Sequence, residues 1–144
     1  MLPVDPTEID SEDIGEEQTT LEMEHDEAVE HVRETCEAVG FGVPTEFSAS
    51  EVLNEKVDAD RDPYYVLGAC SPEMANRALE ETFDMGALFP CNMVVHQVEP
   101  GVQRVYHLSI MRVARLVGIA PDNDAWQGIV EDTGELVEDF FERV

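Results

Sequence analysis

Residues 63–95 constrain the fold more than any other stretch, because they predict a strand, a helix and a second strand in close succession. The nearly continuous apolar run over 64–69 is typical of a strand that is buried on both faces or central in a sheet. Ser71-Pro72 then predicts the start of a helix, with serine as the N-cap and proline in the first turn. The second strand is expected over 91–98, so this stretch supplies two strands of one sheet.

Further elements are predicted on both sides of this stretch. The turn signal Glu99-Pro100-Gly101 joins the strand over 91–98 to an antiparallel partner over 102–108. Periodicity and turn signals predict two more strands, at 19–23 and 41–47, and helices at 26–39, 48–57, 109–117 and 121–144. We expect an α+β fold: two layers, with a largely antiparallel sheet of four or five strands and helices packed on one face. Residues 1–18 are rich in acids and are expected to form a disordered tail before a single domain over 19–144.

The charge of the chain is unevenly distributed. There are 33 acids, eight basic residues of which one is lysine, and a formal net charge of −25. Residues 61–120 hold six of the acids and five arginines, so almost all of the net charge lies outside this segment. Such a surface repels itself in dilute buffer, whereas the Debye length of about 3 Å at 1 M salt screens most of the repulsion. The composition predicts a halophilic protein and argues against nucleic-acid binding, which needs clustered lysine and arginine.

An acidic mesophilic protein that binds cations or basic partners is the alternative, but the acids are scattered rather than grouped in blocks. No apolar run approaches the roughly 20 residues of a membrane span. The first residues have neither a basic flank nor an apolar centre, so no signal peptide is expected. The odd count of three cysteines argues against a secreted disulfide framework. A cytoplasmic protein without a membrane or nucleic-acid partner is therefore predicted.

Cys70 and Cys91 are the first candidates for a functional site, because each lies where a predicted strand meets a turn. Cys70 directly precedes the Ser71 cap, and a thiol beside a helix N-terminus is favoured as thiolate. If the two strands are neighbours, the two sulfurs would handle sulfur species, hold a soft metal or form a regulatory disulfide. The alternative is that both are small buried hydrophobes, as is expected for Cys36 in the apolar stripe of the first helix.

His96 and His107 are weaker candidates for a metal or haem site. A tight turn at Pro100-Gly101 would place His96 opposite Val105 and His107 opposite Val94. The two rings would then be diagonal neighbours on one face of the sheet. Because the sequence offers no firm third ligand, no metal site is assigned, and ordinary cross-strand or solvent-facing histidines are the favoured interpretation.

The arginines suggest a different site. Arg112 and Arg115 are three residues apart, opposite the apolar stripe of their helix. Together with Arg77 or Arg104 they could bind a carboxylate or phosphate ligand in bidentate fashion. The simpler alternative is that all four pair with the surplus of surface acids. The chain has no glycine-rich phosphate loop, CxxC pair, HExxH motif or nucleophile elbow.

Three blocks of sequence resemble the family called domain of unknown function 302. They are 40–47 (GFGVPTEF), 64–79 (YYVLGACSPEMANRAL) and 86–95 (GALFPCNMVV), in the family's order and spacing, and the resemblance extends over roughly 19–144. The resemblance implies a two-layer α+β fold, grouped with TBP-like folds, and a homodimeric assembly. It implies no established activity. Membership of this fold group does not imply DNA binding, because function depends on the site and not on the fold. Many members have an Asp-Pro pair where this chain has Ser109-Ile110.

Two functional hypotheses follow. The first is a small dimeric ligand-binding or sensing protein, with a two-thiol site at Cys70 and Cys91. The second is an enzyme that acts on sulfur species, or on a small acidic substrate held by arginines. The sequence assigns no cofactor and names no ligand.

Overall fold

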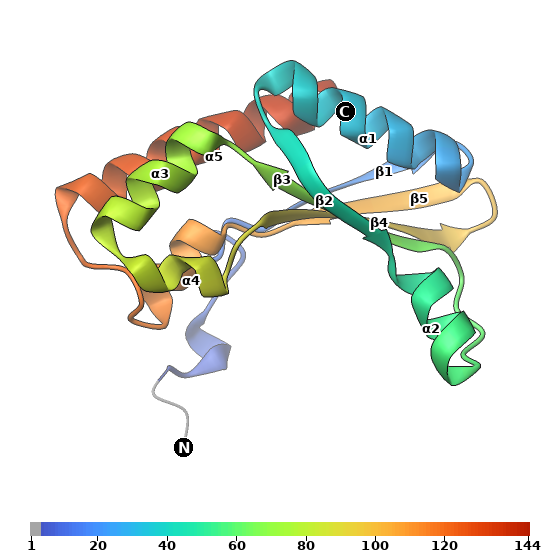
Figure 1. Ribbon diagram of the computed structural model, residues 1–144, viewed down its shortest axis with the longest axis horizontal. Helices are drawn as coiled ribbons and strands as arrows, with labels where there is room; N and C mark the ends of the chain where they lie inside the picture. Colours follow the sequence, from blue (N-terminus) through green and yellow to red (C-terminus); the bar gives the residue numbers. More distant parts are fainter. Residues whose placement is uncertain (1–3) are drawn as a thin grey trace.

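One layer of the fold is a five-stranded antiparallel sheet with the strand order β1-β5-β4-β3-β2 (Figure 1). The structure is a computed structural model and describes residues 4–144. The strands are β1 (Glu17–Glu22), β2 (Gly42–Ser48), β3 (Tyr64–Cys70), β4 (Cys91–Glu99) and β5 (Val102–His107). The helices are α1 (His25–Val39), α2 (Ala49–Val57), α3 (Pro72–Glu81), α4 (Ile110–Leu116) and α5 (Asp124–Arg143), with short 3-10 turns η1 (Pro6–Glu8) and η2 (Phe83–Ala87).

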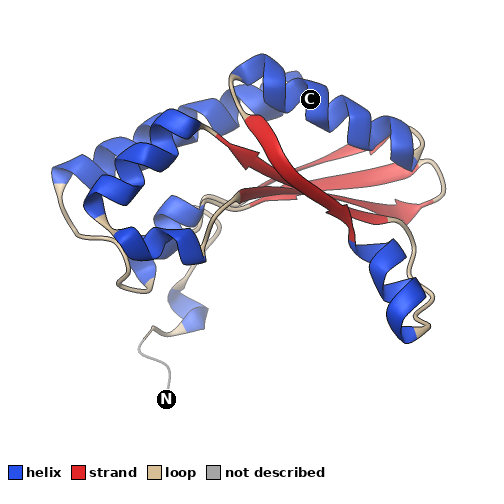
Figure 2. Cartoon of the chain, viewed as in Figure 1, coloured by secondary structure: helices blue, strands red, loops and turns tan. Residues whose placement is uncertain are grey.

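Helices α1 and α5 lie together over one face of the sheet (Figure 2). Helices α3 and α4 lie beyond one end of the strands, and α2 extends away from the sheet on the side opposite α1 and α5 (Figure 1). The expected two-layer α+β fold with a largely antiparallel sheet is therefore confirmed. None of the described helices is long and apolar enough to span a membrane.

Two groups of buried side chains stabilise this arrangement. The first fills the space between the sheet and helices α1 and α5, and includes Val32, Phe41, Leu67, Val95 and Phe140. The second joins α3, α4 and α5 around Trp126, and includes Ala78, Met85, Met111 and Ile129. Most residues of the helical stripes that the sequence predicted lie on the faces that these two groups bury, but Val117, in the stripe predicted for 109–117, is exposed.

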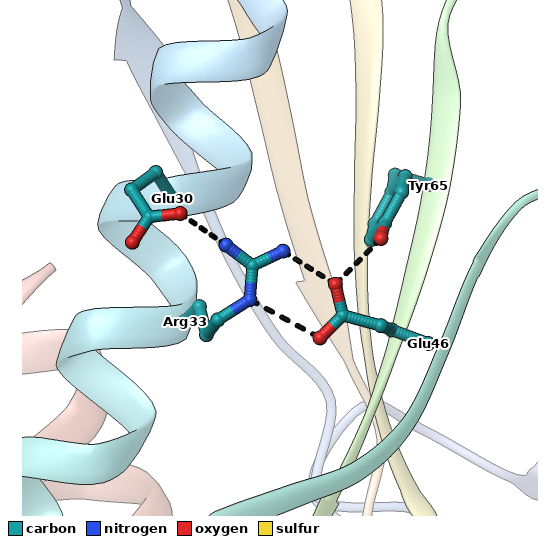
Figure 3. Close-up of polar contacts among 4 residues, drawn as sticks. All are labelled: Glu30, Arg33, Glu46 and Tyr65. Carbon is teal, nitrogen blue, oxygen red and sulfur yellow. Dashed lines mark hydrogen bonds and ion pairs between the residues drawn. The ribbon is translucent and has the colours of Figure 1, made fainter.

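Helix α1 is attached to the sheet by a polar cluster at its middle (Figure 3). The Arg33 guanidinium contacts Glu30 and both carboxylate oxygens of Glu46, with Nε donating to Oε2 at 3.1 Å. The Tyr65 hydroxyl donates to the same carboxylate at 2.6 Å. The Arg33 hydrogen bond, followed by that of Tyr65, holds the pKa of Glu46 below its ordinary value. This cluster therefore stabilises the fold above the ordinary glutamate pKa, and its contribution is lost as the pH falls through the depressed pKa.

Thr45 of β2 and the ring of Pro90 lie directly against Gly68 of β3. A Cβ atom on Gly68 of β3 would lie 2.4 Å from the Thr45 hydroxyl oxygen and 2.6 Å from the Pro90 ring. Only glycine fits at this point, because such distances are far below van der Waals contact. The register of β2 also shifts between Gly42 and Thr45, next to Pro44.

The first strand of the domain begins at an earlier residue than the sequence predicted. Strand β1 begins at Glu17, inside the predicted tail of residues 1–18. Just before it, the backbone N–H of Ser109 donates to the carbonyl of Ile14 at 2.8 Å. The first three residues of the predicted tail lie outside the described residues.

Candidate functional site

A largely apolar cavity of about 240 Å³ lies where the end of β3, the start of β4 and helices α3, α4 and α5 meet. Cys70 and Cys91 are both among the residues of its wall. Ala69 is directly opposite Cys91 in the antiparallel β3–β4 pair, and Cys70 is the next residue along β3. Opposite residues in such a pair have Cα atoms about 4.5–5.5 Å apart, so the two cysteines are close along the backbone. Because side chains alternate along a strand, Cys91 shares the helix-covered face with Met93, whereas Cys70 shares the open face with Gly68.

The two thiols differ in environment. Cys91 is 8% exposed, and burial raises its pKa to about 12, with a smaller contribution from the nearby Cys70. Cys70 is half-buried and precedes Ser71, the N-cap residue of α3. Cys36, on α1, is fully buried and is not part of the cavity wall, and burial raises its pKa to about 12 as well. Among the three, Cys70 is therefore the thiol most accessible to a ligand or reagent.

The same cavity also contains groups that the sequence did not single out. The thioethers of Met74 (α3) and Met111 (α4) and the side chain of Thr133 (α5) are part of its wall. Thr133 is 4% exposed, and its Oγ1 is the one buried side-chain oxygen or nitrogen in residues 4–144 that has no hydrogen-bond partner. In the sequence these three residues belong to ordinary helical apolar stripes, so no local signal distinguishes them from core residues.

A second, more polar cavity of about 510 Å³ lies on the other side of Thr133, between β5 and α5. His107, Arg112 and Glu131 contribute to its wall. The Nδ1–H of His107 donates to the Asn92 carbonyl at 3.0 Å, which leaves Nε2 without a proton in the neutral ring. Burial lowers the pKa of His107, so the neutral form is favoured.

The expectation that His96 and His107 share a face of the sheet is wrong. A register shift between Gln97 and Glu99 places His96 opposite Arg104, whereas His107 pairs with Glu17 of β1. His107 is consequently buried on the helix side, and His96 lies on the opposite face, stacked on Tyr64 at 5.5 Å between ring centroids. Within residues 4–144, no three His, Cys, Asp or Glu side chains are grouped so as to hold a metal ion.

The four candidate arginines do not meet at one site. Arg77 pairs with Asp132 at 2.7 Å, and Arg115 pairs with Asp122 at 2.8 Å. Arg104 lies on the open face of the sheet, 4.5 Å over the Tyr106 ring, with Nε donating to Gln18 at 2.8 Å. Arg112 borders the polar cavity and shares a smaller one, of about 150 Å³, with Arg115.

The comparisons with known proteins agree with this fold. The family described as Domain of unknown function DUF302 matches residues 17–144. The chain belongs to this family. A crystal structure of an uncharacterised conserved DUF302 protein from Bacillus stearothermophilus is similar, with 26% sequence identity and a TM-score of 0.75. The similarity covers 89% of this chain and 96% of that one. No curated protein shows significant similarity to the chain.

In this DUF302 protein, Ser109-Ile110 stands where many family members have Asp-Pro, and the structure explains why both pairs are compatible with the fold. Ser109 is the N-cap of α4, and its side-chain oxygen accepts a hydrogen bond from the Arg112 backbone N–H at 3.2 Å. Aspartate caps helices in the same way, and proline is favoured at the first helical position, where Ile110 stands here. Both residue pairs therefore suit the start of this helix.

Proposed function

We propose that this DUF302 protein is a small dimeric binding or sensing protein that holds its ligand in the cavity between Cys70 and Cys91. The observation that carries the proposal is that both cysteines are among the residues that line one apolar cavity, at the end of the β3–β4 strand pair. Ligand sites are typically concave and apolar, with a few polar groups that fix orientation. The unpartnered Thr133 hydroxyl is such a group, because a buried polar atom without a partner costs about 1–3 kcal/mol that a ligand hydrogen bond would offset.

The three thiols are expected to react with iodoacetamide in the order Cys70, Cys91, Cys36. Cys70 is the most exposed, whereas Cys36 is completely buried. If the first two form one site, alkylation of Cys70 should alter the accessibility of Cys91, and mild oxidant should link them within one chain. That link requires Cα atoms within about 7 Å. Mass-spectrometric mapping of labelling against time, in native high-salt buffer and before and after oxidation, measures both effects.

Two results would contradict these expectations. If Cys70 and Cys91 both resist labelling until the protein unfolds, they are core residues and the proposal fails. If Cys36 labels first, the packing of α1 against the sheet is wrong.

The open face of the sheet is the surface proposed for dimerisation. Three cross-strand rows make up most of it: Thr20–Arg104–His96–Tyr64, Gln18–Tyr106–Val94–Val66–Phe47 and Asn92–Gly68–Thr45. These rows contain no acid, and Arg104 is their one charged residue. Glu22, two residues after Thr20 and opposite Val102, is an acid at the border of this face, so two copies with a net charge of −25 each can meet over the three rows with few acids between them. Phe47 and Tyr64 are 52% and 40% exposed, so apolar area is available for burial between copies.

A dimer is expected in molar KCl, with a mass by light scattering of about twice the 16.1 kDa chain. Phe47→Glu should convert it to a monomer, because it places a carboxylate opposite its symmetry-related surface. Phe83→Glu is the matched control: Phe83 is 88% exposed on η2, away from the open face, and its replacement should leave the dimer intact. A wild-type monomer at micromolar concentration and above would exclude the dimer.

The alternative hypothesis is an enzyme that acts on sulfur species at the same two thiols. A bound chromophore or metal in the purified protein supports binding or sensing, whereas a colourless, metal-free protein with one hyper-reactive thiol supports the enzyme. The arginine-held acidic substrate has less support, because Arg77 and Arg115 are already paired with aspartates. We also propose a cytoplasmic, halophilic setting, which the acidic surface and the odd cysteine count support.

A further inference from the structure

We propose that the polar cavity between β5 and α5 binds the ammonium group of a small primary alkylamine, with His107 Nε2 and the carboxylates of the cavity wall as hydrogen-bond acceptors. This would be a second binding site, and it does not depend on the two cysteines. The cavity volume of about 510 Å³ lies within the range of small-molecule sites, about 300–1,000 Å³.

The most buried polar group of this cavity is a histidine nitrogen that lacks a partner. His107 is 1% exposed, and its Nδ1–H donates to the Asn92 carbonyl, so Nε2 of the neutral ring is an acceptor. Among residues 4–144, Thr133 Oγ1 is the one fully enclosed side-chain oxygen or nitrogen without a partner. Nε2 also has no partner within these residues, so it is not fully enclosed and opens into the cavity. An acceptor in this place requires a donor from the ligand.

The charges in the wall favour a cation. The wall contains four glutamates and one arginine: Glu17, Glu131, Glu135, Glu138 and Arg112. None of these five residues takes part in an ion pair within residues 4–144. Glu17 is opposite His107 in the β1–β5 pair, so their side chains share one face of the sheet. The other three glutamates follow one side of α5, because they are four and three residues apart. Four carboxylates against one guanidinium attract a positively charged ligand.

The arrangement of these acceptors suits an organic ammonium ion better than a metal ion. Within residues 4–144, no three His, Cys, Asp or Glu side chains are grouped closely enough to hold a metal, so the acceptors are spread around the cavity. An ammonium group donates three separate hydrogen bonds, and it does not need its acceptors to surround one compact ion. Val130 and Val137 add an apolar part of the wall for a short alkyl chain.

Gly134 of α5 keeps this cavity open. Glycine in a helix interior lowers stability relative to other residues, and a Cβ atom here would meet no other atom within 4 Å. Packing therefore does not require glycine at this position. The missing side chain instead leaves free space in the cavity wall.

The test is an NMR titration of the full-length, ¹⁵N-labelled protein in molar KCl at neutral pH. The three probes have similar shapes and different charges: n-butylammonium, 1-butanol and butyrate. A primary alkylamine is protonated at this pH, as is lysine with its pKa of about 10.4. Butylammonium is expected to shift the His107 Nε2 resonance and the amide resonances around Gly134. Because its hydrogen bonds are charge-assisted, it should bind more than about tenfold more tightly than either of the other probes.

Three variants separate binding from folding. Gly134→Leu fills the cavity, so butylammonium binding should weaken more than about tenfold, while the melting temperature should not fall because leucine favours the helix. Glu135→Gln should weaken binding about two- to fivefold, as expected for one solvent-accessible ion pair. Glu142→Gln is the matched control on the same helix but outside the cavity wall, and it should leave the affinity unchanged.

Several results would overturn the ammonium site. They are no shift of His107 Nε2 with butylammonium, equal binding of 1-butanol, or unchanged binding in a folded Gly134→Leu variant. Butyrate binding that is lost in Arg112→Gln would show that the cavity is an anion site instead. None of these results depends on cysteine labelling, so the proposed thiol site is tested separately.

Discussion

Replacement of Trp126 with alanine is expected to destabilise the protein by about 3–5 kcal/mol, a large part of the stability of a single domain. Trp126 is completely buried and lies in the group of side chains that joins α3, α4 and α5. Its indole N–H also donates to the Met111 carbonyl. Truncation therefore leaves a cavity and an unpaired carbonyl next to the thiol site.

Urea unfolding followed by far-UV circular dichroism measures this effect, since Trp126 is the only tryptophan and its fluorescence is lost in the variant. Trp126→Phe is the matched comparison: it keeps most of the apolar volume and removes the N–H, so a smaller loss of about 1–3 kcal/mol is expected. Val117→Ala, at a residue 60% exposed, should change the free energy of unfolding by no more than about 0.5 kcal/mol. A loss below about 1 kcal/mol for Trp126→Ala would show that α4 and α5 do not pack as described.

Transfer to dilute buffer is expected to weaken or abolish the folded state, and molar KCl should restore it. Six of the 33 acids form ion pairs within residues 4–144, so most carboxylates face solvent without a cationic partner. Their mutual repulsion acts over a Debye length of about 30 Å at 0.01 M salt, but only about 3 Å at 1 M. The folded state concentrates these charges more than the unfolded chain does, so it suffers more when screening is removed.

Thermal unfolding across a series of KCl concentrations, followed by circular dichroism, measures this dependence. The melting temperature should rise steeply with salt from the lowest concentrations. Refolding on return to molar KCl separates a reversible electrostatic effect from aggregation. A melting temperature that stays constant from dilute buffer to molar salt would refute the halophilic interpretation.

The fold was predictable because its signals are local. Ser71-Pro72 marked the start of α3, and the helix predicted over 26–39 corresponds to α1, which ends before Gly40, where a φ of 107° suits glycine. The pairing of β4 with β5 was predicted, but the register was wrong by one residue. The extra residue between Gln97 and Glu99 moved His96 to the face opposite His107, and nothing in the turn sequence reveals such a shift.

The candidate site was only partly predictable from the sequence. Cys70 and Cys91 stood out because of their places at strand ends. Met111 and Thr133 did not, because they reach the cavity only through the packing of α4 and α5 against the end of the sheet. Contacts between elements so far apart in sequence depend on tertiary structure, which hydrophobic periodicity alone does not specify.

The place of β1 at the edge of the sheet has a consequence for synthesis on the ribosome. Its one strand partner is β5, which follows it by about 80 residues, while β2, β3 and β4 pair with strands that are near in sequence. A nascent chain therefore carries β1 without a strand partner until Val102–His107 has emerged from the exit tunnel. The N-terminal strand is made first but completes the sheet last, so a message truncated before the β4–β5 hairpin yields a chain with an unpaired strand.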